Sequence, residues 1–162
     1  MKTKMDSTEP IQGSVVDAVL SSSRVLVAVA ARSLADVAEE VTLTQYRTLV
    51  VLASRGPQHL AGLATLVNVT PATATRMCDR LVRKGLIRRS QVRGDRRSRR
   101  LALTPKGRTL VDEVTARRRK EIERIVSGIP AKEQAVLIQA LGRLSAAGGE
   151  VPELDWSTGW DL

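Results

Sequence analysis

Two short amphipathic segments follow one another between Leu60 and Lys84, and the break between them is only a few residues long. The first has apolar residues at helical spacing up to Val67, and Asn68, which tolerates the left-handed backbone, follows it. The second begins with Thr70-Pro71, an N-cap followed by proline at the first helical position, and it stops at Gly85. Two such helices joined by a tight turn form a helix-turn-helix, whose second helix is the recognition helix.

The stretch that follows predicts a basic β-hairpin. Residues 86–92 and 99–103 read as two antiparallel strands, with Leu101 and Leu103 on one face. The turn between them contains Gly94-Asp95. A helix-turn-helix followed at once by such a hairpin is a winged helix, so we expect a mainly α-helical fold with a small β-hairpin wing and a DNA-binding lobe at residues 44–103.

The charge of the chain is concentrated in this lobe. The 25 residues from Arg76 to Arg100 include eleven basic and two acidic residues, a net charge of +9. The other 137 residues hold fifteen bases and fifteen acids and are neutral. One segment thus accounts for the whole imbalance, which predicts a localised site for a polyanion.

Helices are predicted on both sides of the lobe. An apolar helical period runs from Val15 to Val41, about seven turns, and a helix of that length in a small chain indicates a partner subunit. A second helix has Thr44 as its expected N-cap and ends at Gly56-Pro57. Thr104-Pro105 opens a long helix that Pro130 breaks, and a last helix covers 131–146. The expected division is a disordered arm at 1–12, dimerisation helices at 13–43 and 104–147, and an acidic tail at 148–162.

The composition excludes several other classes of protein. Aromatic residues make up only 2% of the chain, which argues against proteins that stack single-stranded nucleic acid on aromatic rings. One cysteine and one histidine cannot form a structural zinc site, an internal disulfide or a nucleophile–base pair. We therefore expect that the protein binds no metal or cofactor and is not an enzyme. Neither a membrane span nor a secretory signal is expected, and a reducing cytoplasm is the predicted compartment.

The stretch from Thr44 to Gly107 closely resembles the MarR (multiple antibiotic resistance regulator) family of transcriptional regulators. The wing carries the most specific match, Asp95-Arg96-Arg97 followed by Leu101-Ala102-Leu103-Thr104-Pro105-Lys106-Gly107; further matches are Leu63-Ala64, Thr75-Arg76, Asp79-Arg80-Leu81 and Lys84-Gly85-Leu86-Ile87. The resemblance implies a homodimer on a palindromic double-stranded operator with half-sites about 10 bp apart, more often a repressor, which a small-molecule effector releases. The effector would lie between the dimer helices and the lobe, where Tyr46, Arg47 and Arg24 are polar groups that could face it.

The predicted DNA contacts come from the recognition helix and the wing. Arg76 is the candidate for a bidentate contact to guanine, while Thr73 and Thr75 could touch a base edge, a thymine methyl or a phosphate. The helix N-terminus at Thr70 and Pro71 would offer backbone N–H groups to phosphate. Solvated hydroxyl groups are the alternative for the threonines.

In the wing, Arg97 would enter the minor groove, and in the family this arginine is held by the acid two residues earlier, here Asp95. Arg96 would add a phosphate contact. Cys78 falls on the inward face of the recognition helix, which argues against redox sensing, and His59 reads as a loop residue.

Two readings of the basic segment stay open at this point. The first is a sequence-specific regulator, which the polar set on the recognition helix and the Asp95–Arg97 pair favour. The second is an architectural DNA-binding protein without sequence preference or effector, because charge alone would satisfy it.

Overall fold

The structure is a computed structural model that describes residues 8–37, 41–92, 95–152 and 156, with side chains outside 8–12 and 91–99. In chain order the elements are α1 (Thr8–Leu34), η1 (Ala35–Val37), α2 (Leu43–Arg55), β1 (Gln58–His59), α3 (Leu60–Leu66), α4 (Pro71–Arg83), β2 (Ile87–Val92), β3 (Asp95–Leu103), α5 (Pro105–Val126) and α6 (Ala131–Ala147). This is the mainly α-helical winged helix that the sequence predicts.

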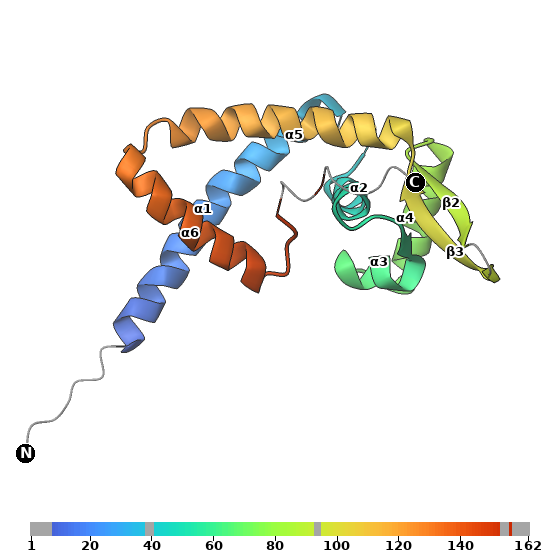
Figure 1. Cartoon of the computed structure of the whole chain (residues 1–162), viewed down its shortest axis with the longest axis horizontal. Coiled ribbons are helices and arrows are strands. Elements are labelled where there is room, and N and C mark those ends of the chain that lie inside the picture. The colour runs from blue at the N-terminus through green and yellow to red at the C-terminus, as the bar shows by residue number, and fades with distance from the viewer. Residues whose placement is uncertain (1–7, 38–40, 93–94, 153–155, 157–162) are drawn as a thin grey trace, which may run out of the picture.

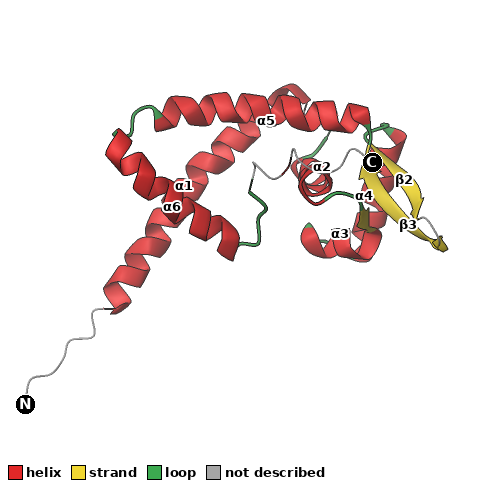
Figure 2. Cartoon of the chain, viewed as in Figure 1, coloured by secondary structure: helices red, strands yellow, loops and turns green. Residues whose placement is uncertain are grey.

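The long helix α5 joins two parts of the molecule (Figure 1). At one end lies a compact lobe of α2, α3, α4 and the small sheet, and at the other end lie α1 and α6. Figure 2 shows that all strands belong to the lobe and that the rest of the described chain is helical or loop. The core lies within the lobe and under the first half of α5, built from Tyr46, Leu49, Leu63, Leu81, Leu86, Ile87, Val111 and Val114.

The helix-turn-helix forms as its capping residues predict. Thr70 caps α4, because its hydroxyl accepts a hydrogen bond from the Thr73 N–H at 3.2 Å and Pro71 occupies the first turn. Asn68, in the turn before it, takes the left-handed conformation with φ 53°. Thr104 and Pro105 repeat the same start at α5, where the Thr104 hydroxyl accepts from the Gly107 N–H at 3.1 Å.

The junction between the wing and α5 is unusually tight. The Thr104 hydroxyl donates to the carbonyl oxygens of Gly85, at 2.6 Å, and Leu86, at 3.1 Å, while the Thr104 N–H also donates to Leu86. Gly107 lies so close to this turn that a Cβ on it would stand 2.0 Å from the Leu86 carbonyl oxygen. The absence of a side chain at Gly107 therefore allows α5 to begin directly against the root of the wing.

The sheet has one strand more than the sequence predicts. Its order is β1-β3-β2, and the two-residue β1 pairs Gln58 with Leu101 and His59 with Arg100. The prediction placed His59 in a loop, because a two-residue strand leaves no pattern. It also placed Asp95 to Ser98 in the turn, whereas β3 already begins at Asp95, paired with Val92 after an irregularity in the register.

Several predicted boundaries were wrong. The first helix begins at Thr8, inside the segment expected to be a disordered arm, and it ends at Leu34 rather than near Val41. The N-cap of α2 is Thr42 rather than Thr44, because Thr42 and Gln45 form a reciprocal capping box. The helix α5 ends at Val126, before the Pro130 that was expected to break it.

The outer helices expose the faces that the periodicity predicts to be inward. In α6 no residue is buried, and Val136 and Leu144 are 68% and 48% exposed. In α1, Val16, Leu20 and Val27 are likewise exposed. By length and composition alone the helical stretch Gly13–Val37 is apolar enough to cross a membrane. These faces lack a cover within a single chain.

Candidate nucleic-acid interface

The recognition helix α4 presents a polar face to solvent because its apolar face is fully used in the core. Ala74, Met77, Cys78 and Leu81 are buried, and the Thr48 hydroxyl lies 3.4 Å from the Met77 sulfur. Arg76, Arg80 and Arg83 are exposed. The helix is therefore rigidly seated, and its position sets where these guanidinium groups stand.

Hydrogen bonds within the helix occupy part of its N-terminal donor set. The Thr70 hydroxyl donates to the Thr73 hydroxyl at 3.0 Å, and the Thr75 hydroxyl donates to the Pro71 carbonyl at 2.9 Å. A base or phosphate would thus meet Thr75 through its methyl group or as an acceptor. Pro71 has no N–H, and the N–H groups of Thr73 and Ala74 are bonded to Thr70. The helix N-terminus consequently offers fewer backbone donors than the sequence suggests.

Arg76 lies at the edge of a cavity of about 360 Å³ between α4 and the first turn of α2. Arg80, one turn further along α4, shares this cavity, and so do the threonines Thr42, Thr44 and Thr73. Two cations and several hydroxyl groups at one exposed cleft suit a phosphate or a base edge. The structure thus brings Arg76 and Thr73 together, as predicted, while Thr75 is absent from the cavity lining.

The wing is tied to the recognition helix by an ion pair that the sequence did not reveal. The guanidinium of Arg89 on β2 donates to the carboxylate of Asp79 on α4. This contact neutralises the acid within the recognition helix and fixes the wing root beside it. In the sequence, Asp79 is one acid among many arginines, and this pattern does not identify the arginine with which it pairs.

The tip of the wing carries three of the predicted contacts. The backbones of Asp95, Arg96 and Arg97 form the start of β3, but their side chains lie outside the described residues. Their roles stay predictions. Nearer the root, the Arg100 Nε donates to His59 Nε2 at 3.4 Å, which joins β3 to β1.

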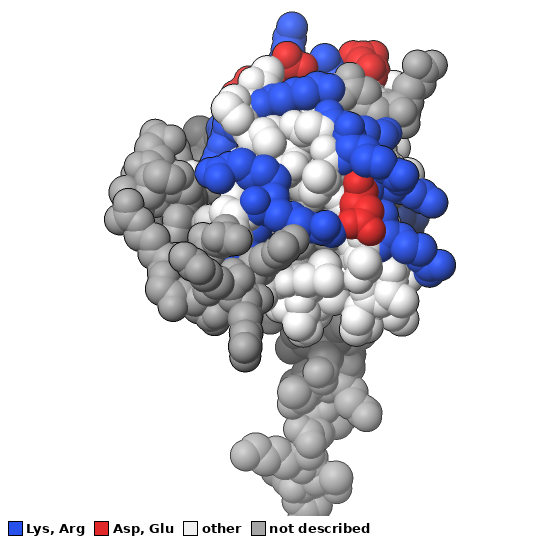
Figure 3. Space-filling model, turned by 90° about the vertical axis from the view of Figure 1, so that its right-hand side faces the viewer, with Lys and Arg blue, Asp and Glu red and all other residues white. Residues whose placement is uncertain are grey.

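The charge of the lobe faces outward on one side. Figure 3 shows Lys and Arg side chains spread over the lobe end of the molecule, with one acidic group between them. Arg80 and Arg83 of α4 and Arg88 and Arg100 of the wing are exposed, so both elements contribute positive charge to the surface of the lobe. A polyanion can be attracted by such a surface over a wide area.

Cys78 is fully buried on the inward face of α4. Burial raises the pKa of its thiol from 9.0 to about 11; Arg89 lowers this pKa and Asp79 raises it, but by less. A thiolate is the reactive form of cysteine, so this side chain packs as a small apolar group. Among the described residues, no group of three His, Cys, Asp or Glu side chains could hold a metal ion.

A second cavity, of about 490 Å³, runs along α5 and has Trp156 in its lining. Arg118 stands over the Tyr46 ring at 5.6 Å, and the Tyr46 hydroxyl lies 3.5 Å from that of Thr115. The Arg118 Nε is buried without a hydrogen-bond partner among the described residues. The cavity is lined by Thr115, Arg118, Arg119, Ile122, Glu123, Val126, Ser127, Gln134 and Trp156.

The three polar groups that were suggested as ligand contacts do not line this cavity. Arg24 donates to Ser21 on its own helix, and Arg47 binds Glu150. Tyr46 is buried beneath Arg118. Arg118 and Trp156 were missed, because a basic run on α5 and a tryptophan in the tail have no local pattern that points to a cavity.

Comparisons with known proteins agree on one family. The MarR family model matches residues 41–98. The crystal structure of RV1404 from Mycobacterium tuberculosis is 44% identical, covers 93% of this chain and 99% of its own, and superposes with a TM-score of 0.80. A MarR family protein from Bacillus stearothermophilus has 20% identity, coverage of 88% and 99%, and a TM-score of 0.78. NadR in complex with 4-hydroxyphenylacetate has 22% identity, coverage of 90% and 98%, and a TM-score of 0.63.

Proposed function

This chain belongs to the MarR family of transcriptional regulators, and on that basis we propose that it is a dimeric, sequence-specific regulator of transcription, a repressor released by a small molecule. The observation that carries the proposal is the fixed geometry of α4 and the wing. The Asp79–Arg89 ion pair and the Thr104 junction hold both elements to one core, so that a helix and a basic hairpin face the same side. That arrangement suits a major groove and the minor groove next to it.

The proposed base and phosphate contacts come from named positions. Arg76 reads a guanine, Thr73 and Thr75 contact a base edge or a phosphate, and the helix start at Thr70 and Pro71 lies against the backbone. In the wing, Arg97 enters the minor groove, Asp95 orients it, and Arg96 contacts a phosphate. The exposure of Arg76 beside Arg80 supports the first of these roles.

The homodimer is supported by the uncovered apolar faces of α1 and α6. A soluble chain that exposes Val27 at 63% and Ile138 at 72% gains most by covering these faces with a second copy of itself. The same cover accounts for the apolar length of α1 without a membrane. A two-fold dimer presents two lobes and therefore binds a palindromic operator, in the cytoplasm.

The effector is proposed to occupy the cavity along α5. Its volume of about 490 Å³ falls in the range of small-molecule sites, roughly 300–1,000 Å³. The unpartnered Arg118 Nε favours a ligand with an acceptor group, and the fold relative NadR binds 4-hydroxyphenylacetate. Such a ligand releases DNA only if it binds the DNA-incompetent state more tightly.

Selection of bound fragments from genomic DNA, followed by footprinting, tests the proposal. We expect a few palindromic sites that are bound at least about 10³-fold more tightly than random duplex at the same salt concentration. The +9 segment alone would also suit the architectural alternative, which predicts the same affinity for every duplex. Uniform binding would therefore refute the regulator and support that alternative.

A further inference from the structure

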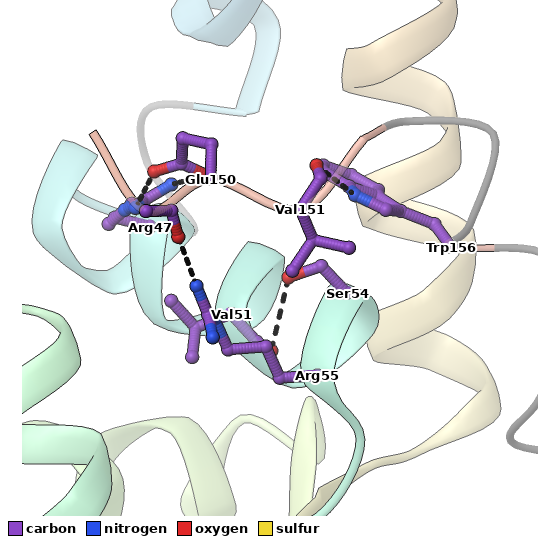
Figure 4. A network of polar contacts seen from close by, with 8 residues as sticks. Arg47, Val51, Ser54, Arg55, Glu150, Val151 and Trp156 are labelled. Atoms are coloured by element: carbon purple, nitrogen blue, oxygen red, sulfur yellow. Dashed lines mark hydrogen bonds and ion pairs between the residues drawn. The ribbon is translucent and has the colours of Figure 1, made fainter. Parts of the chain in front are cut away.

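The chain does not leave the molecule after α6. Gly149 takes a left-handed conformation with φ 72° and turns the chain back toward the lobe. We call Gly149–Pro152 together with Trp156 the C-terminal strap. Figure 4 shows this strap lying across α2, with Glu150 beside Arg47 and the Trp156 ring near α5. The sequence predicts an acidic tail from residue 148, and the first residues of this tail are bonded to the lobe.

The first anchor of the strap is on α2. Both terminal nitrogens of Arg47 donate to the Glu150 carboxylate, one of them at 3.2 Å, in the forked geometry that fixes orientation. Arg55, two turns along the same helix, donates to the Gly149 carbonyl. Two guanidinium groups of one helix therefore hold two consecutive residues of the strap.

The second anchor is the indole of Trp156. This half-buried side chain packs against the core of the lobe, and its N–H donates to the Val151 carbonyl at 3.2 Å. The ring also forms a wall of the cavity beside Thr115 and Ile122 of α5. The strap thus contacts α2 of the lobe and lines the cavity, and its two described parts meet in the hydrogen bond between Trp156 and Val151.

Each contact alone is weak. The Arg47 and Glu150 side chains are both 42% exposed, and an exposed ion pair contributes little to stability. Their effect differs because they join the end of α6 directly to α2, and these two helices belong to different parts of the molecule. Holding two such parts in one orientation reduces the freedom that is lost when DNA binds.

We propose that Glu150 and Trp156 are positioning residues for DNA binding, which hold the lobe in a set orientation to α5 and α6 through the strap. The same segment carries any displacement of the cavity wall to α2. This inference rests on the proposed function for its effect on DNA, while the strap itself is tested without DNA.

The test without DNA uses the tryptophan fluorescence of the full chain, excited where Tyr46 does not absorb, with Trp160→Phe in every protein so that Trp156 is the one tryptophan. The variants are Glu150→Arg, Arg47→Glu and the double exchange, which restores an opposite pair. If the two anchors act as one strap, the ratio of released to bound strap rises about two- to fivefold in each single variant, the range that one ion pair supports, and acrylamide quenching of Trp156 increases with it. It returns toward the starting value in the double exchange. Glu133→Arg, an equal charge change on exposed α6, leaves the quenching unchanged.

The same proteins are then titrated with operator DNA. We expect Glu150→Arg to bind about two- to fivefold more weakly than Glu133→Arg, and the double exchange to recover the affinity. Quenching that stays the same in the single variants, or a double exchange no better than either single variant, overturns the strap. If the starting protein binds no DNA selectively, the proposed function fails, while the quenching result still decides whether the strap exists.

Discussion

The substitution Gly107→Ala should separate close packing at the wing root from ordinary helix propensity. In most exposed helix positions alanine is more stable than glycine by roughly 0.5–1 kcal/mol. At Gly107 the new Cβ would lie 2.0 Å from the Leu86 carbonyl oxygen and 3.1 Å from Leu103 Cδ2. Carbon–oxygen contacts across strands lie near 3.3–3.6 Å, so α5 or the turn has to move by about 1.3 Å or more.

That movement cannot be taken up by a flexible side chain, because the closest atom belongs to the backbone. It also strains the bonds of Thr104, which caps α5 and joins it to Gly85 and Leu86. Overpacking costs about 1–3 kcal/mol and a lost N-cap about 0.5–2 kcal/mol. We therefore expect a loss of about 2–4 kcal/mol, which lowers Tm by roughly 5–15 °C in a chain of this size.

Thermal unfolding followed by circular dichroism measures this effect at one fixed protein concentration, since dimers unfold in a concentration-dependent manner. The matched control is Gly62→Ala in α3, where the nearest atom to a new Cβ is the flexible Gln58 side chain at 3.9 Å. The control should gain about 0.5–1 kcal/mol. A Gly107→Ala protein that melts with the control, or above the original chain, refutes the packing assigned to this junction.

Three further outcomes are expected. Arg97→Ala should weaken operator binding about tenfold or more while Tm shifts by less than about 2 °C; unchanged affinity at moderate salt, measured by anisotropy, contradicts the wing assignment. Operator affinity should fall by roughly 10³–10⁵ between 50 and 200 mM salt if 6–10 phosphates are neutralised, and a flat dependence argues against a phosphate interface. The pKa of the Cys78 thiol is near 11, so at pH 8 an alkylating reagent should modify it at least about 100-fold more slowly in the folded protein than in protein unfolded in urea. Equal rates in the two states would show that the thiol is accessible in the folded protein. Because its folded pKa lies above 9.0, its contribution to stability is complete below pH 9 and declines toward pH 11.

The order of helices, the helix-turn-helix and the wing could be predicted because each depends on local signals. Thr70-Pro71 and Thr104-Pro105 each combine an N-cap with a proline in the first helical turn. Asn68 and Gly85 take the left-handed conformation in the turns before and after α4. Some errors arose where contacts between distant residues decide, such as the two-residue strand β1 that pairs with β3. One error was local, because Thr42 is followed three residues later by Gln45, the capping-box pattern that Thr44 lacks, and the two residues bond reciprocally.

The site was predictable as a set of residue types but not as a set of contacts. Periodicity placed Arg76 outside and Cys78 inside, as the structure has them. The Asp79–Arg89 pair joins two elements ten residues apart, and Trp156 lies beside the earlier helix α5; one sequence contains no information on which residues pair in this way. Those contacts between elements are also the ones that fix their relative position.

The tight root of the wing has a mechanical consequence. Because Thr104 and Gly107 join α5 directly to the turn after α4, the lobe and the start of α5 move as one rigid body. With 22 residues, α5 is a lever of about 33 Å, so a tilt of about 5° at its far end swings the recognition helix through roughly 3 Å. In a two-fold dimer both α5 helices tilt, and the distance between the two recognition helices changes by several ångströms. A slight repacking near α6 is then enough to put two otherwise unaltered lobes out of phase with the double helix.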